Sequence, residues 1–83
     1  MVVNPWDLFY GDLSYTDYPE PIDKHYGCKV SWYIYDNQKL AQQASRAAKH
    51  NAELREMEGF DFGYMSPGQI TEKDDGTFTV VIP

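Results

Sequence analysis

Residues 36–59 read DNQKLAQQASRAAKHNAELREMEG, and this stretch organises the rest of the chain. Apolar residues recur in it at helical spacing, which predicts one long amphipathic helix. Either Asp36 or Asn37 suits the N-cap, and Gly59 suits the left-handed position that ends a helix, so we expect a helix over about 37–58. Its apolar stripe is nearly all alanine and consists of Leu40, Ala41, Ala44, Ala47, Ala48, Ala52 and Leu54.

An alanine stripe permits close backbone approach but adds little volume to a core. A helix of roughly 22 residues spans about 33 Å, whereas a strand of about six residues covers only about 20 Å. Because the helix outruns a small sheet, aromatic segments of the same chain or of a second copy must cover the remainder. We expect a homo-oligomer whose interface is formed by Leu40, Ala44, Ala47, Ala48, Asn51 and Leu54.

Asn51 lies near the centre of the alanine stripe, where a polar group is costly unless it is paired. Two interpretations stay open for it. In the first, the amide forms a hydrogen bond with a carbonyl of a neighbouring loop. In the second, it sets the register of a helix–helix contact, as polar residues do at coiled-coil seams.

Residues 28–35 alternate in a way that predicts a strand, because β-branched and aromatic residues recur with a period of two. A helix that runs straight through from Ser31 is the alternative. The alternation places Cys28, Val30, Trp32 and Ile34 on one face, and Lys29, Ser31, Tyr33 and Tyr35 on the other. We expect Cys28 to be a small core residue.

Residues 69–82 predict a β-hairpin around Asp75 and Gly76. A two-residue turn would mix polar and apolar side chains on one face. A three-residue loop with Gly76 in the left-handed position instead gathers the apolar side chains on one face, and burial favours that register. The apolar set is Ile70, Phe78, Val80 and Ile82.

The sequence therefore predicts a single α+β domain over residues 1–83. Asn4 and Pro5 read as a helix start, which indicates one or two helical turns over residues 5–10. Prolines and acids make residues 12–23 extended or irregular. The expected order is a short N-terminal helix, one strand, the long helix and the C-terminal hairpin, which forms a small antiparallel sheet against the helix.

The chain of 83 residues carries a formal net charge of −6, and the charge is laid out in blocks. Residues 1–23 hold five acids without Lys or Arg, residues 24–55 hold six bases against two acids, and residues 56–83 hold six acids and Lys73. A single cysteine, with neither a signal peptide nor a long apolar run, favours a cytoplasmic location, in a cell or in a virus-infected host, and no membrane partner.

The chemistry-bearing residues are sparse. One cysteine and two histidines fall short of the four ligands of a structural zinc site, and no glycine-rich phosphate loop is present. We therefore expect no metal, no cofactor and no catalytic residues. This absence favours a binding protein over an enzyme.

Two segments are candidates for binding. The solvent face of the long helix gathers four bases that are candidate nucleic-acid-binding residues, Lys39, Arg46, Lys49 and His50, with Tyr33 and Tyr35 as nearby stacking rings. The alternative, which we favour, is an ordinary solvated face that the acidic N-terminal segment of the same chain or of a neighbour neutralises. The acidic, aromatic N-terminal segment over residues 1–27 either packs its rings on the 28–83 core of the same domain, which we favour, or acts as a docking segment whose rings enter pockets of a partner or of a second copy. Its candidate protein-binding residues are Trp6, Leu8, Phe9, Tyr10, Tyr15 and Tyr18.

From these patterns we expect a small, non-enzymatic protein-binding module that forms homo-oligomers. Small acidic, aromatic-rich chains of this kind are frequent in bacteriophage genomes, so a phage origin belongs to the expectation. The alternative is a factor linked to nucleic acid. It would bind single strands through the basic helix face, or its acids would mimic nucleic-acid charge and block a DNA-binding protein.

Overall fold

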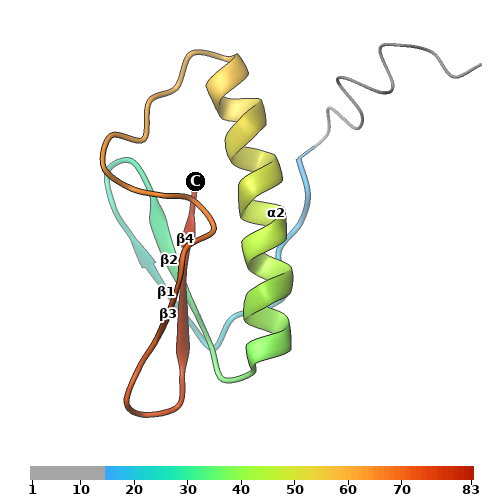
Figure 1. Cartoon of the computed structure of the whole chain (residues 1–83), viewed down its shortest axis with the longest axis vertical. Coiled ribbons are helices and arrows are strands. Elements are labelled where there is room, and N and C mark those ends of the chain that lie inside the picture. The colour runs from blue at the N-terminus through green and yellow to red at the C-terminus, as the bar shows by residue number, and fades with distance from the viewer. Residues whose placement is uncertain (1–14) are drawn as a thin grey trace, which may run out of the picture.

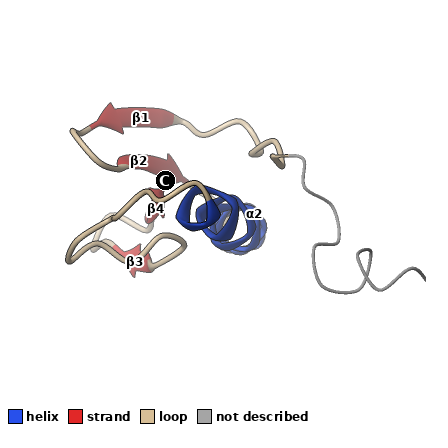
Figure 2. Ribbon diagram, turned by 90° about the horizontal axis from the view of Figure 1, so that it is seen from above, coloured by secondary structure: helices blue, strands red, loops and turns tan. Residues whose placement is uncertain are grey.

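The computed structural model describes residues 15–83, which fold into a helix on one face of a four-stranded antiparallel sheet (Figures 1 and 2). The strands lie in the order β1-β2-β4-β3. This confirms the predicted α+β architecture with its long helix and C-terminal hairpin. The elements are β1 (Asp23–Tyr26), β2 (Ser31–Tyr35), α2 (Gln38–Met57), β3 (Ile70–Glu72) and β4 (Phe78–Ile82).

The ends of α2 are capped as the sequence predicts. Asn37 is the N-cap, and its side-chain oxygen accepts hydrogen bonds from the backbone N–H groups of Lys39 at 2.8 Å and Leu40 at 3.2 Å. Asn37 rather than Asp36 therefore satisfies the first free donors of the helix. After the C-cap at Glu58, Gly59 takes a φ of 91°, which ends the helix in the left-handed region.

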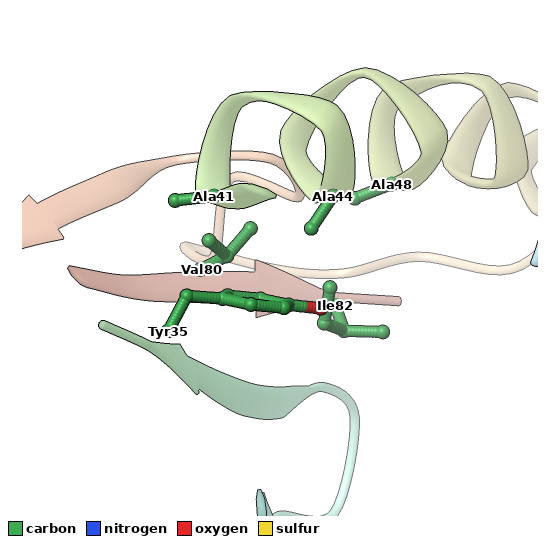
Figure 3. Close-up of a cluster of buried hydrophobic side chains, with 6 residues drawn as sticks. All are labelled: Tyr35, Ala41, Ala44, Ala48, Val80 and Ile82. Atoms are coloured by element: carbon green, nitrogen blue, oxygen red, sulfur yellow. The ribbon is translucent and has the colours of Figure 1, made fainter. Parts of the chain in front are cut away.

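The main core forms where the alanine stripe of α2 meets β2 and β4. Ala41, Ala44 and Ala48 are fully buried, and their small side chains let the helix backbone approach the sheet closely. The volume comes from the sheet, where Tyr35 on β2 lies beside Val80 and Ile82 on β4 (Figure 3). The helix therefore packs on the face of β2 that carries Tyr33 and Tyr35.

The C-terminal hairpin has the predicted register. Ile70 pairs with Val80, and Glu72 pairs with Phe78. The Lys73 N–H donates to the Thr77 carbonyl at 2.8 Å, which closes a three-residue loop with Gly76 at a φ of 85°. The alternation along β4 places Phe78, Val80 and Ile82 toward α2, as burial of the apolar face requires.

The structure corrects two predictions before the helix. Strand β1 was missed, so two strands rather than one precede α2. All four of its residues are exposed, and an edge strand of this kind shows no alternation of apolar side chains. The turn from β1 to β2 is closed by a hydrogen bond from the Gly27 N–H to the Val30 carbonyl at 2.9 Å. Because of this turn, β2 begins at Ser31 and not at Cys28. Cys28 is therefore exposed rather than in the core.

The predicted N-terminal helix over residues 5–10 lies outside the described residues. The first described segment, residues 15–22, is extended and runs beside α2 into β1 (blue in Figure 1). We call residues 15–22 the strap. Extended backbone here agrees with the prediction for residues 12–23 as far as that range is described.

A second core cluster fastens the long connection between α2 and β3. Phe62 is buried against Val30, Ala52 and Val81, with Trp32 and Met65 packed around them. Farther along the connection, the hydroxyl of Ser45 on α2 donates a hydrogen bond to the Gly68 carbonyl. The connection is thus tied to both the sheet and the helix.

Two glycines at similar φ values separate backbone strain from steric conflict. Gly76→Ala places an ordinary side chain at a φ of 85° in open space, so we expect a loss of about 1 kcal/mol in the free energy of unfolding. Gly68→Ala has a φ of 90° and also puts a Cβ 2.9 Å from the Ser45 carbonyl oxygen and 2.7 Å from Lys49 Cγ. Urea denaturation should show a clearly larger loss for Gly68→Ala, and equal losses would contradict this packing.

The pH dependence of stability tests the burial of Tyr35. Its hydroxyl donates to the Pro19 carbonyl at 2.8 Å, and burial, with Tyr33 and Tyr18 as further causes, raises the pKa of Tyr35 from 10.0 to about 12. The fold prefers the protonated phenol, so this contribution to stability is fully present below pH 10 and is lost as the pH rises through about 12.

Tyr35→Phe should cost about 1 kcal/mol at neutral pH through the lost hydrogen bond. The stability gap between the two proteins should then narrow as the pH rises from 10 toward about 12, because the variant has no phenol to ionise. Urea denaturation at a series of pH values measures the gap. A gap that stays constant over this range would show that Tyr35 ionises alike in the folded and unfolded chains.

Candidate functional site

The strap is attached to α2 through the amide of Asn51, which is buried. The Asn51 side-chain oxygen accepts the Thr16 N–H at 2.8 Å, and its NH₂ group donates to the Thr16 carbonyl at 2.9 Å and to the Tyr18 hydroxyl at 2.7 Å. This confirms the first of the two interpretations of Asn51, a hydrogen bond to a loop carbonyl. Within the described chain the amide does not serve a helix–helix contact.

Aromatic rings complete the attachment of the strap. The rings of Tyr18 and Tyr33 meet edge to face, with centroids 5.5 Å apart. At the start of the strap, Tyr15 lies under the Arg55 guanidinium and donates its hydroxyl to Glu58 at 2.9 Å. Contacts along the whole length of the strap therefore hold it on the helix and the sheet.

A hollow of about 510 Å³ lies between the strap and the solvent side of α2. Its size is within the range of small-ligand sites, although it is open to solvent. Because its wall carries the two cations Lys39 and Arg46 against one carboxylate, we call it the basic groove. Its lining residues are Thr16, Asp17, Lys39, Gln43, Arg46, Ala47 and His50.

The spacing of α2 explains how these bases come together. Lys39, Arg46 and His50 are seven and four residues apart in the sequence, so successive turns of the helix place them on one side. Two permanent cations, Lys39 and Arg46, face the single carboxylate of Asp17 across the hollow. The groove can therefore attract an anion, and the Arg46 guanidinium can bind a carboxylate or phosphate through two parallel hydrogen bonds.

The structure brings together three of the four predicted nucleic-acid-binding residues, because Lys39, Arg46 and His50 share the basic groove. Lys49 lies in a neighbouring hollow of about 290 Å³, on whose wall Arg46 also lies. Arg46 thus stands between the two hollows. The predicted stacking rings do not join them, since Tyr35 is buried in the core and Tyr33 is half-buried against Tyr18.

The predicted oligomer-interface residues are already engaged within the chain. Five of them are buried, and Leu40 is half-buried against the main core. Leu40, Ala44 and Ala48 pack in the main core and Asn51 bonds to the strap, and the role of the set between copies stays a prediction. The five buried residues are Ala44, Ala47, Ala48, Asn51 and Leu54.

The predicted protein-binding residues divide at the start of the described chain. Trp6, Leu8, Phe9 and Tyr10 lie outside the described residues. Tyr15 is exposed and Tyr18 is half-buried, and both lie on the strap against α2. Of this set, only Tyr15 offers an exposed ring in the part that the structure describes.

The sequence did not reveal Thr16, Asp17 and Gln43 as parts of the groove. Gln43 follows from the helical period, because it lies one turn after Lys39 and one turn before Ala47. Thr16 and Asp17 are brought there by the hydrogen bonds to Asn51. The polar Asn51 on the alanine stripe indicated that some segment docks there, but the sequence did not show which segment.

Two other properties bear on the chemistry of residues 15–83. No group of three or more His, Cys, Asp or Glu side chains in this range is placed to hold a metal ion. No helix in the same range combines the length and apolar character that crossing a membrane requires.

Comparisons of the chain with protein-family models, with curated proteins and with solved structures find no match. The assignment of a role to the basic groove therefore rests on its own residues and their geometry.

Asn51→Ala tests whether the strap depends on the buried amide. The variant leaves the Thr16 N–H and carbonyl without their partner, so we expect a loss of about 2 kcal/mol in the free energy of unfolding, measured by urea denaturation. Gln42→Ala is the matched control, because Gln42 is an exposed amide on the same helix and should change stability by less than about 0.5 kcal/mol. Equal effects of the two substitutions would contradict this role of Asn51.

Proposed function

We propose that this protein is a small, non-enzymatic module that binds an acidic segment of a partner protein in the basic groove. The observation that carries the proposal is the gathering of Lys39 and Arg46 around one hollow in a chain whose formal net charge is −6. Bases that serve only as a solvated face need not converge on a hollow. The strap gives this groove a second wall, so an extended segment would lie between two surfaces.

A peptide fits the groove better than a nucleic acid does. The negative charge of the whole chain opposes a long polyanion, and the Asp17 carboxylate on the groove wall would repel closely spaced phosphates. Nucleobases also need exposed aromatic side chains on which to stack, whereas Tyr35 is buried. The aliphatic stem of Lys39 instead offers apolar contact to the side chains between two carboxylates.

The test is fluorescence anisotropy with a short labelled peptide of alternating Glu and Tyr, added to the full chain at low salt. We expect binding that weakens as salt rises, and no binding of the matched peptide with Gln in place of Glu. Arg46→Ala should weaken binding by about tenfold, since charge-assisted hydrogen bonds contribute about 1.5–3 kcal/mol. Lys73→Ala, which removes the same charge from the hairpin loop, should leave binding unchanged.

Two results would overturn the proposal. One is equal binding of the Glu and Gln peptides, or an equal effect of the Arg46 and Lys73 substitutions. The other is tighter binding of single-stranded oligothymidine than of the acidic peptide, with a steep salt dependence that Arg46→Ala reduces. That second result would instead establish the nucleic-acid alternative.

A further inference from the structure

A second surface of unusual character lies at the C-terminal end of α2. Met57, Phe60 and Tyr64 are all exposed there within eight positions of the sequence, and Tyr64 is completely exposed. Large apolar side chains clustered in this way on a small protein typically mark a contact site. We call residues 56–64 the aromatic end.

The aromatic end is held in shape. Phe62 points into the second core cluster, while its ring lies 4.8 Å from that of Phe60. The Gly63 N–H donates to the Asp61 carboxylate at 2.8 Å, and the Met65 N–H donates to the Phe62 carbonyl at 3.2 Å. Exposed rings on an anchored loop lose little freedom on binding, which favours their use as anchors.

The aromatic end is also acidic. It carries Glu56, Glu58 and Asp61, and no Lys or Arg occurs from residue 56 to residue 72. Two bases border it: Arg55, which precedes Glu56 on α2 and lies over the Tyr15 ring, and Lys29, whose ammonium lies next to Gly63. Acids interspersed with exposed rings are the chemistry that the basic groove is proposed to bind.

We propose that the aromatic end of one copy of this protein occupies the basic groove of a second copy. Tyr64 and Phe60 supply apolar contacts there, and Glu56 and Asp61 face Lys39 and Arg46. This inference rests on the proposed function and names its partner, which is the chain itself. It also gives the expected homo-oligomer an interface outside the buried alanine stripe.

The separation of the two surfaces on one chain determines how copies can be joined. Arg46 and Met57 are eleven residues apart on α2, which is about 16 Å along the helix axis. A chain therefore presents its groove and its aromatic end at separate places and can offer both at once. Two copies that exchange both contacts form a closed two-fold dimer, whereas contacts that are not reciprocated build rings or open chains of subunits.

The test uses three charge-reversal variants of the full chain in sedimentation velocity at low salt. Arg46→Glu, the groove variant, reverses a charge in the basic groove. Glu56→Lys with Tyr64→Lys, the aromatic-end variant, replaces an acid and a ring of the aromatic end with lysines. Both positions are exposed, so the substitutions should leave the fold intact. The matched control, Glu72→Lys with Tyr26→Lys, makes the same chemical changes at exposed positions on β3 and β1.

We expect the wild type and the control to form dimers or larger species as concentration rises, and the groove variant and the aromatic-end variant each to associate about tenfold more weakly. A mixture of the two variants should regain association, because the intact aromatic end of the groove variant fits the intact groove of the aromatic-end variant. A wild type that stays monomeric, or a mixture that forms no complex, would overturn the inference.

Another occupant is separable in the same assay. If Asp7→Lys with Asp12→Lys abolishes association while the aromatic-end variant still associates, then the N-terminal acids fill the groove and the inference is wrong. Failure here is also distinct from failure of the proposed function. A monomeric chain that still binds the Glu and Tyr peptide through Arg46 loses its self-partner but keeps its binding groove.

Discussion

The close packing of the alanine stripe of α2 on β2 and β4 is the contact on which the rest of the structure depends. Ala41, Ala44 and Ala48 have no bulk of their own, so the helix lies near the sheet and the ring of Tyr35 fills the interface (Figure 3). Larger side chains on the stripe would push the helix away and leave that ring without close neighbours. The buried bulk at this contact therefore comes from Tyr35, Val80 and Ile82 of the sheet rather than from the helix.

The strap packs on α2 because the sheet covers only part of the helix. The helix is 20 residues long, whereas β2 and β4 have five residues each, so the sheet alone leaves part of the helix uncovered. The strap covers part of it, with Tyr18 against Tyr33 and the Asn51 amide bonded to its backbone. A polar residue in the stripe thus fixes the position of an irregular segment, which few apolar contacts could hold alone.

The candidate site is a consequence of this arrangement. The bases on the solvent side of α2 would be an ordinary charged face if the helix stood alone. With the strap beside them, Lys39 and Arg46 border a hollow with a second wall. At the other end of the helix, the buried ring of Phe62 fixes a connection that leaves Tyr64 exposed. The two surfaces for which we propose binding therefore arise from segments that the core holds in place.

The sequence by itself determined the elements whose signals are local. The caps of α2 and the hairpin register follow from neighbouring residues, because dihedral preferences and the period of burial act over a few positions. Only the tertiary structure decided the pairing of β1, the exposure of Cys28, the burial of Tyr35 and the place of Thr16 and Asp17 beside the helix. Each of these depends on contacts between distant segments. Their free energy is set by the surfaces that meet in the fold and not by the local sequence pattern.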